Sequence, residues 1–430
     1  MMTLLNKKAS RSDLINDLPS NVVDAILANL TLRDQVRTSI LSKNWRYMWT
    51  SVSQICIDEC FFERFWHVDD RDRDRVVCKI ITKVLMLHNG PIHKFTLFIP
   101  FDSCFKITVE YLNMWIPILS KKDIKYLELV NCDDAVPDEM PYIVLSCKEL
   151  TYFEFGGFNL SVPPNFCSFK RLLELHLVCV RFESGALESL MSGCPILEKL
   201  SIEQCTGCDS LVISSPSLKV FELELRDDMK SISLKRAKNL IDFTLNAQQN
   251  NLSGSIKGLP KLKSLSLFGM EKIPLADIIP PTLLTSSLSS LEYLKLSDMN
   301  LNEKGELLYF VSVLKSAPRL IELDIQNYNM VDTAQVSDLS EELKCRSCCC
   351  LKLQTVNIYM EANSQHVMSL IKFILANSTL LKTLTLDCSY NKLKADMLFR
   401  ISQDLLLMER ASPRAQVKFH PSSSTYSLFE

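Results

Sequence analysis

Cysteine and histidine are the residues of this chain best suited to metal binding or nucleophilic catalysis. The sequence has 16 cysteines and 6 histidines. Two C-x-x-C pairs occur, Cys205/Cys208 and Cys345/Cys348, and this spacing is the one used within four-cysteine zinc sites. The two pairs lie far apart in the sequence, however, and no histidine accompanies either of them. The spacing therefore favours structural thiols over a zinc site, and we expect no metal.

Catalytic motifs are also missing from the sequence. No H-x-x-x-H and no G-x-S-x-G occurs, and a cysteine–histidine pair can always be imagined when cysteines are so numerous. Glycine makes up only 10 of the 430 residues, and neither G-x-G-x-x-G nor G-x-x-x-x-G-K-[ST] is present. A nucleotide-phosphate cradle therefore has no support, and we expect a non-catalytic chain without a cofactor.

Composition limits the class of protein further. The chain is 47% hydrophobic, which allows a large core, and its net charge of −2 argues against a nucleic-acid binder. No run of eighteen apolar residues occurs, and Met1–Ser12 lacks the apolar core of a signal peptide. We therefore expect free thiols in a reducing compartment, the cytoplasm or the nucleus, and no membrane association.

The elements that would position any functional residue begin with three short helices within residues 13–52. Leu18-Pro19 opens the segment in an extended conformation, because proline disfavours helical backbone at the residue before it. Ser20 or Asn21 can then cap a first helix. Its apolar residues recur at four-residue spacing, at Val22, Ile26 and Leu30, flanked by Val23 and Leu27.

Capping residues mark the second and third helices. Thr31 followed by Asp34 has the spacing of a capping box, with Asp in place of the usual Glu. Ser42 is placed to cap a third helix, on which Trp45 and Trp49 fall one turn apart. Such clustered apolar residues form either a helical cap that seals a larger fold or a surface that docks a partner.

The order of these residues resembles the F-box motif in the form common in plants. Leu18-Pro19, Val36-Arg37-Thr38-Ser39 and Leu41-Ser42-x-x-Trp45-Arg46-x-x-Trp49 carry the resemblance. It implies an F-box over residues 11–52 that docks a Skp-family adaptor and, through it, a cullin–RING ubiquitin ligase. The residues implied for adaptor binding are Leu18, Pro19, Val22, Ile26, Leu30, Leu41, Trp45 and Trp49.

Residues 53–91 are expected to form a connector that ends in a capping helix. The alternating charges from Asp69 to Arg75 predict a solvated loop or helix start. His88-Asn89-Gly90-Pro91 is typical of a helix end. The apolar face of the helix is marked by Val76, Ile80, Val84 and Leu87.

One pattern then recurs twelve times from Ile92 onward: apolar, two variable residues, apolar, one variable residue, apolar. Leu172-Leu175-Leu177 and Leu197-Leu200-Ile202 are two of its copies, and successive copies begin 21 to 33 residues apart. A series of this kind is the signature of leucine-rich repeats.

The repeats predict an α/β solenoid, a leucine-rich-repeat horseshoe over residues 92–345 that follows the three-helix F-box. In each repeat the last two apolar residues turn one face of a short strand inward. Neighbouring repeats must stack with parallel strands on the concave face, because a single repeat cannot bury its own apolar face. Residues 276–290 and 332–350 are expected to be longer insertions between repeats.

The C-terminal part resembles the FBD domain that accompanies F-boxes and leucine-rich repeats in plants. Arg410-Ala411-Ser412 followed by Val417-x-Phe419 is its most distinctive feature, whereas Glu361-Ala362-Asn363-Ser364 replaces the usual glycine-containing turn. The resemblance implies FBD-like repeats and a cap over residues 346–420, followed by a disordered tail over residues 421–430. The last elements are expected at Ala395–Glu409, a helix, and Ala415–His420, a strand.

Strand residues that point away from the core are candidate contacts for a protein target. Both signs of charge occur among them, which favours a protein or peptide ligand over an anionic one. Plain solvation explains most single positions equally well, and a small-molecule pocket within the arc is a further possibility. The candidates are Glu174, His176, Lys199, Ser201, Glu203, Glu222, Glu224, Lys263 and Lys295.

These features point to a substrate-receptor subunit of an SCF-type (Skp–cullin–F-box) E3 ubiquitin ligase. The F-box would dock the adaptor, and the repeats would recruit an unknown protein target for ubiquitination and proteasomal degradation. The ligase role is implied by the resemblance, whereas the periodicity predicts only a binding surface. The alternative is a leucine-rich-repeat interaction scaffold that recruits no ligase.

Overall fold

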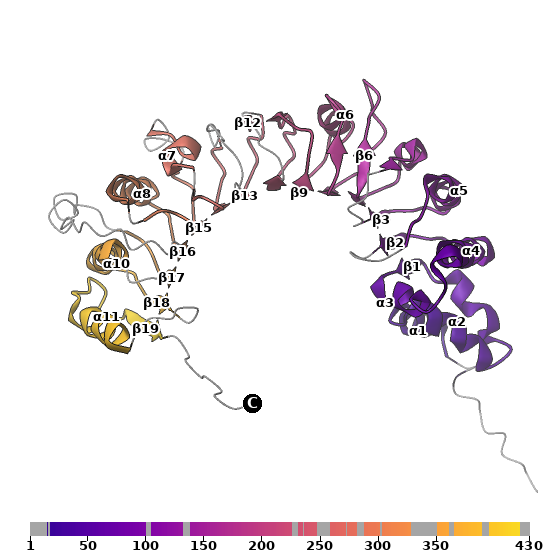
Figure 1. Ribbon diagram of the computed structural model, residues 1–430, viewed down its shortest axis with the longest axis horizontal. Coiled ribbons are helices and arrows are strands. Elements are labelled where there is room, and N and C mark those ends of the chain that lie inside the picture. The colour runs from indigo at the N-terminus through magenta and orange to yellow at the C-terminus, as the bar shows by residue number, and fades with distance from the viewer. Residues whose placement is uncertain are drawn as a thin grey trace, which may run out of the picture. The chain divides into compact units, whose positions relative to one another are not determined.

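Figure 1 shows the computed structural model of the 430-residue chain. It describes residues 15, 18–99, 105–131, 138–225, 231–234, 236–246, 259–271, 273–281, 288–301, 303–327, 351–360, 365–388 and 395–421. The chain forms two compact units. The N-terminal unit consists of residues 1–161 with the short segments 168–172 and 178–181, and the C-terminal unit contains the rest.

The N-terminal unit begins with the expected helical segments. These are α1 (Ser20–Ala28), α2 (Leu32–Arg37) and two 3-10 helices, η1 (Thr38–Ile40) and η2 (Trp45–Ser51). Thr31 Oγ1 accepts a hydrogen bond from the Asp34 amide at 3.3 Å, so the predicted cap of α2 forms. Ser42 Oγ accepts one from the Trp45 amide at 3.2 Å, but η2 begins after Asn44 and has no side-chain cap, so Ser42 is not the cap that was predicted. The first cap was predicted wrongly, because α1 begins after Pro19 without a side-chain cap.

The buried face of α1 is displaced by one residue from the predicted apolar face. Val23 and Leu27 of α1 are buried with Trp45 and Val52, whereas Val22 and Ile26 remain exposed. Both pairs have the four-residue spacing of a helix face. Packing against the Trp45 indole decides which of the two adjacent stripes turns inward.

The connector contains a strand that the sequence pattern did not predict. β1 (Gln54–Ile57) pairs in parallel with β2 (Lys94–Ile99), so the sheet begins inside residues 53–91. The helices α3 (Glu59–Phe62), η3 (Glu63–Phe65) and α4 (Asp70–Leu87) follow β1. The helix α4 is present as expected, but of its predicted core residues only Val84 is buried, together with Val77, Ile81 and Leu85.

Parallel strands continue through the N-terminal unit in the order β1-β2-β3-β5. β3 (Tyr126–Asn131) and β5 (Tyr152–Gly156) place Phe95, Leu127 and Phe153 in register, and all three are buried. The helix α5 (Val109–Ser120) precedes β3. The smaller elements are β4 (Asp138–Glu139), η4 (Tyr142–Ser146) and β6 (Phe158–Leu160).

The C-terminal unit continues the same repeat. Its parallel strands run in sequence order: β7 (Glu174–Val178), β9 (Lys199–Cys205), β11 (Val220–Leu225), β13 (Asp242–Asn246), β14 (Ser264–Phe268), β15 (Tyr293–Ser297), β16 (Glu322–Asn327), β17 (Thr355–Met360), β18 (Thr383–Asp387) and β19 (Gln416–His420). Each of the twelve apolar patterns coincides with a strand in one of the two units, which confirms the predicted solenoid.

Helices and short strands complete the repeats of the C-terminal unit. They are β8 (Arg181–Phe182), α6 (Ala186–Ser192), β10 (Ser210–Val212), β12 (Ser231–Ser233), α7 (Leu275–Ile278), α8 (Lys304–Ser316), α10 (Gln365–Asn377) and α11 (Ala395–Leu407). Figure 1 shows α8 and α10 together on one side of the strands β16 and β17. The helix α7 occupies the start of the predicted insertion 276–290, whereas residues 328–350 and 422–430 lie outside the described residues.

Within the described residues, no helix combines the length and apolar character needed to cross a bilayer.

Candidate functional site

Several apolar side chains of the first helices face solvent. Val22 and Ile26 on α1 are 37% and 39% exposed, and Val36 on α2 is 37% exposed. Ile40 and Leu41, in and just after η1, are 86% and 53% exposed. We call these five residues the F-box apolar surface. Large exposed aliphatic side chains on a folded segment are typical of a partner-docking surface.

The eight predicted adaptor-binding residues divide between this surface and the core. Val22, Ile26 and Leu41 belong to the F-box apolar surface, and Pro19 is exposed beside it in sequence. Leu18 and Leu30 are half-buried and pack against the core. Leu18 and Leu30 therefore offer less surface to an adaptor than fully exposed leucines would.

The two tryptophans are core residues. Trp45 is 2% exposed and Trp49 is 8% exposed, and Trp45 Nε1 donates a hydrogen bond to the Ile15 carbonyl at 3.2 Å. Burial leaves neither indole with surface for an adaptor, which corrects the role expected from the sequence. Trp45 packs with Val23 and Leu27, which holds η2 against α1 and presents the F-box apolar surface on a rigid support.

Sequence reasoning missed Val36 and Ile40. Both are apolar, but α2 has only six residues and is followed directly by η1, so the segment is too short to show helical periodicity. Their exposure could have been suspected only because neither residue fits a buried helical face. Tyr47, which is 67% exposed on η2, was missed for the same reason.

The predicted target-binding residues near β7, β9 and β11 mostly pair with one another. His176 Nε2 lies 3.6 Å from Glu174 Oε2, and Lys199 Nζ lies 3.1 Å from Glu222 Oε1. Glu203 and Glu224 are paired in register, and Gln204 donates to Glu224. Ser201 is fully buried and donates to Glu203 Oε1 at 2.8 Å, so its expected surface role is wrong.

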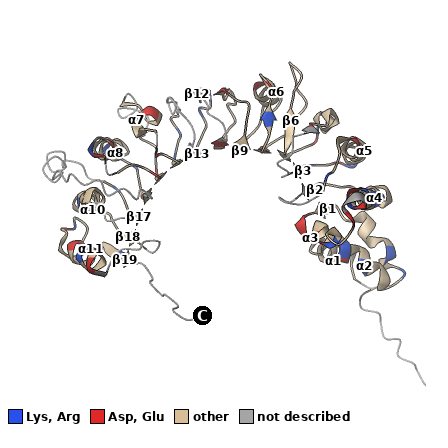
Figure 2. Cartoon of the chain, in the orientation of Figure 1, with Lys and Arg blue, Asp and Glu red and all other residues tan. Residues whose placement is uncertain are grey.

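The two remaining candidates lie at β14 and β15. Lys263 directly precedes β14, with Nζ 3.0 Å from Glu292 Oε1. Lys295 on β15 holds its ammonium 4.9 Å from the centroid of the Phe268 ring. Within the C-terminal unit, Figure 2 shows acidic and basic residues mixed along the elements and not separated by sign. The strand face therefore offers paired charges of both signs.

The strand face of the N-terminal unit carries a hydrogen-bond network that is not among the predicted target-binding residues. Glu128 Oε2 accepts hydrogen bonds from Thr96 Oγ1 at 3.2 Å and from the Tyr126 hydroxyl at 3.3 Å. Glu154 lies opposite Glu128 in register. Burial, and next the charge of Glu154, raises the pKa of the Glu128 carboxyl above its usual range.

Two family models match the chain. One is described as FBD-associated F-box protein At5g56370, LRR repeats, and matches residues 112–325; the other is the F-box domain, which matches residues 15–55. The matches do not overlap and together cover more than half of the 430 residues. The chain therefore carries an F-box followed by FBD-associated leucine-rich repeats.

Relatives extend the likeness over almost the whole chain. The chain is 29% identical to F-box/FBD/LRR-repeat protein At1g13570 of Arabidopsis thaliana, over 95% of this chain and 98% of that protein. It is 24% identical to F-box/LRR-repeat protein 13 of the same plant, over 96% and 97%. Among solved structures, an internalin of Listeria monocytogenes aligns with 14% identity and a TM-score of 0.37, over 81% of this chain and 90% of that chain.

The family matches cover residues 15–52 of the predicted F-box and most of the repeats. They include the helices from α1 to η2 and the strands from β3 to β16. The segment 346–420 lies outside both matches, so its boundaries as an FBD-like region stay a prediction. The last predicted helix and strand are nevertheless present, as α11 and β19.

The described residues include no group of three or more His, Cys, Asp or Glu side chains that could hold a metal ion. Cys205, the first member of one C-x-x-C pair, is buried and its thiol lies 3.4 Å from the Leu177 carbonyl. Burial raises the pKa of the Cys208 thiol to about 11. The pair Cys345/Cys348 lies outside the described residues.

Proposed function

We propose that this chain is the substrate-receptor subunit of an SCF-type E3 ubiquitin ligase. The F-box match and the names of the relatives support an adaptor role in general terms. The observation that carries the proposal is the F-box apolar surface, five exposed aliphatic side chains on helices whose own core is already filled. Burying such side chains against a Skp-family adaptor is favourable, because apolar burial drives most protein association.

The repeats supply the second half of the proposed role. Parallel strands, each in register with its neighbours, present charged and aromatic side chains at fixed spacing, which suits recognition of a folded or extended protein segment. The chain performs no bond chemistry in this proposal. It raises the local concentration of a target beside a ubiquitin carrier that its partners bring.

The proposed compartment is the cytoplasm or the nucleus. The described cysteines are all free thiols, which fits a reducing environment.

The test is adaptor binding by the purified full-length chain. Wild type is expected to bind a Skp-family adaptor with micromolar or tighter affinity. Ile40→Ser/Leu41→Ser removes two members of the F-box apolar surface and should weaken binding by roughly a hundredfold, as for interface hot spots. Leu406→Ser/Leu407→Ser is the matched control, because it removes two exposed leucines at the end of α11 instead.

Two results would contradict the proposal. Folded wild-type protein that shows no affinity for the adaptor would leave an interaction scaffold as the better account. Equal loss in both double variants would show that general surface hydrophobicity, and not the F-box, drives the association. Circular dichroism of each variant establishes that the chain remains folded.

A further inference from the structure

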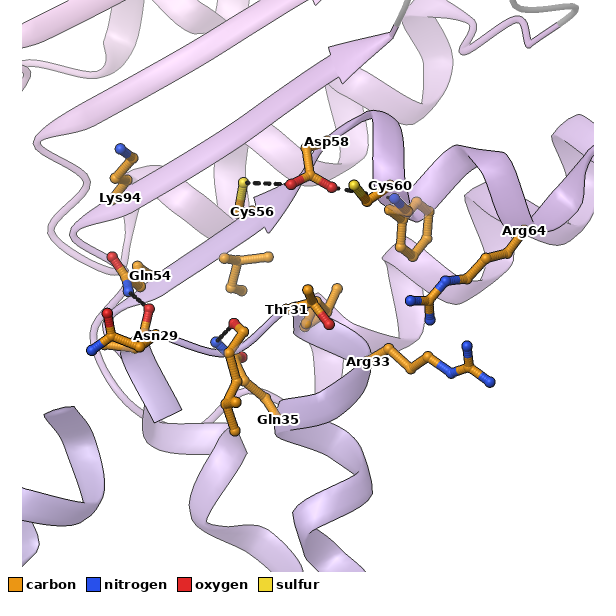
Figure 3. Close-up of a pocket in the computed structure, with 15 residues that line it drawn as sticks. Asn29, Thr31, Arg33, Gln35, Gln54, Cys56, Asp58, Cys60, Arg64 and Lys94 are labelled. Carbon is orange, nitrogen blue, oxygen red and sulfur yellow. Dashed lines mark hydrogen bonds between the residues drawn. The ribbon is translucent and has the colours of Figure 1, made fainter. Parts of the chain in front are cut away.

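A pocket of about 330 Å³ lies inside the N-terminal unit, between the F-box helices and the first strand of the sheet (Figure 3). The end of α1 and the start of α2 form one wall, β1 forms another, and α3 with η3 forms the third. This volume is at the small end of the range for ligand pockets. The adaptor and target surfaces proposed above do not explain it.

Two arginines stand at this pocket without partners among the described residues. Arg33 comes from α2 and Arg64 from η3, and Figure 3 shows both side chains reaching toward the same side of the pocket. Neither guanidinium has a hydrogen bond or an ion pair with another described residue. By contrast Arg37, on the same helix as Arg33, lies 3.6 Å from Asp34. Two cations that share one pocket repel each other unless an anion lies between them.

The other charged groups of the pocket are already engaged. Asp58 caps α3, where its carboxylate accepts a hydrogen bond from the Phe61 amide at 3.2 Å, and the Cys56 thiol lies 3.8 Å from its other oxygen. The Lys94 ammonium lies 4.1 Å from the centroid of the Tyr126 ring. An incoming anion would therefore meet the two arginines.

The remaining lining includes apolar groups. Phe61, Ile55 and Leu30 all line the pocket, and Phe61 is half-buried. An inorganic anion alone would leave this apolar surface wet. An anion that carries a small apolar body would cover it and gain the free energy of apolar burial.

We propose that this pocket binds a small organic phosphate, with its phosphoryl group between Arg33 and Arg64 and its body against Phe61. The planar guanidinium fork matches phosphate oxygens in pairs, which makes arginine better suited to this group than lysine. A phosphomonoester carries nearly two negative charges at neutral pH and so balances the two arginines. The proposal does not depend on adaptor docking.

The experiment is calorimetric titration of the full-length chain with phenyl phosphate, with inorganic phosphate and with neutral benzyl alcohol. Phenyl phosphate should bind most tightly and should lose affinity as salt is added. Inorganic phosphate should bind more weakly because it lacks the apolar body, and benzyl alcohol should not bind measurably. Arg33→Gln/Arg64→Gln should weaken phenyl phosphate binding by at least about tenfold, because hydrogen bonds to charged groups are lost.

Arg37→Gln is the matched control, because Arg37 lies on the same helix but does not line the pocket. It should bind phenyl phosphate like wild type. Arg33→Lys/Arg64→Lys should bind with intermediate affinity, since the charge remains and the fork is lost. Because Arg33 and Arg64 are exposed and have no described partner, the melting temperature should be unchanged in the two double variants.

Three results would overturn the proposal. One is the absence of phenyl phosphate binding at millimolar concentration, and another is equal affinity in wild type and Arg33→Gln/Arg64→Gln. The third is binding of a phosphorylated peptide but not of phenyl phosphate, which would assign the arginines to a protein ligand. Adaptor binding should also be measured with Arg33→Gln/Arg64→Gln. Normal adaptor binding by this variant would show that only the pocket proposal has failed and that the ligase proposal still stands.

Discussion

Tyr126 and Tyr152 lie face to face on neighbouring strands, with ring centroids 3.9 Å apart and only 4° between the ring planes. The parallel pairing of β3 with β5 places them in register, and the same pairing sets Glu128 opposite Glu154. Each tyrosine hydroxyl donates to the glutamate two residues further along its own strand. Two carboxyl groups are thus held beside an aromatic stack, and burial there works against ionisation of Glu128.

This arrangement predicts a pH-dependent stability of the N-terminal unit. The pKa of Glu128 is raised, so the folded chain binds the proton more tightly than the unfolded chain does. Stability contributed by the protonated form is complete below the ordinary glutamate pKa of 4.5 and falls as pH rises through the higher folded value. Glu128→Gln should therefore be more stable than wild type at pH 7, by less than about 1 kcal/mol because the group is partly solvated.

Thermal unfolding at pH 4 and at pH 7 checks this expectation. The difference between Glu128→Gln and wild type should be present at pH 7 and should disappear toward pH 4. Glu63→Gln, at an exposed position, is the matched control and should follow wild type at both values. A variant less stable than wild type at pH 7 would show that the hydrogen bonds to the Glu128 carboxylate outweigh its burial.

A second prediction concerns the tryptophan core of the F-box. Trp45→Ala should destabilise the F-box helices by about 3–5 kcal/mol, because it leaves a large cavity beside Val23 and Leu27. Tyr47→Ala, at an exposed aromatic position on the same 3-10 helix, should change stability by less than about 0.5 kcal/mol. Amide hydrogen exchange over residues 20–52 measures both effects, and similar exchange in the two variants would contradict the buried position of Trp45.

Glycine positions offer a third prediction with an internal control. Gly157 and Gly185 both have a left-handed backbone, with φ of 77° and 75°. An added Cβ at Gly157 would lie 1.8 Å from the Asn131 carbonyl oxygen, whereas one at Gly185 would meet nothing within 4 Å. Gly185→Ala should cost about 1–2 kcal/mol from backbone strain alone, and Gly157→Ala should cost clearly more, because β3 must shift.

Denaturant unfolding of the two alanine variants measures this difference. An equal loss of unfolding free energy in Gly157→Ala and Gly185→Ala would contradict the prediction, because the overlap with Asn131 would then add no destabilisation.

Thiol reactivity provides a fourth prediction. Cys60 and Cys167 are exposed, whereas Cys147 and Cys194 are buried, and burial raises the pKa of each buried thiol to about 12. Brief treatment of the native chain with iodoacetamide should therefore label Cys60 and Cys167 first. Cys147 and Cys194 should react only after denaturation. Mass spectrometry of the resulting peptides reads out the order, and early labelling of Cys194 would contradict its place in the core.

The sequence was sufficient for the repeats but not for the orientation of the first helix. Twelve apolar patterns located twelve strands, because a strand that buries alternate residues must repeat with a period of two. On α1, however, Val22 with Ile26 and Val23 with Leu27 have the same spacing. Periodicity cannot choose between such adjacent stripes, and only the position of Trp45 decides.

The features that sequence reasoning missed depend on contacts between elements. β1 has only four residues, and its place in the sheet depends on pairing with β2, which lies far along the chain. Arg33 and Arg64 line the pocket of Figure 3 from separate elements, so no local sequence motif indicates it. A motif search therefore misses any site whose residues come from separate elements that pack together only in the folded chain.

The parallel register of the C-terminal unit has a consequence for how such a chain can change in length. Leu200, Phe221 and Phe243 occupy equivalent places on three successive strands. Because each strand meets only its two neighbours, a whole repeat could be duplicated or removed while the remaining layers keep their pairing. Evolution could thus lengthen or shorten the sheet in repeat-sized steps without redesigning the F-box helices.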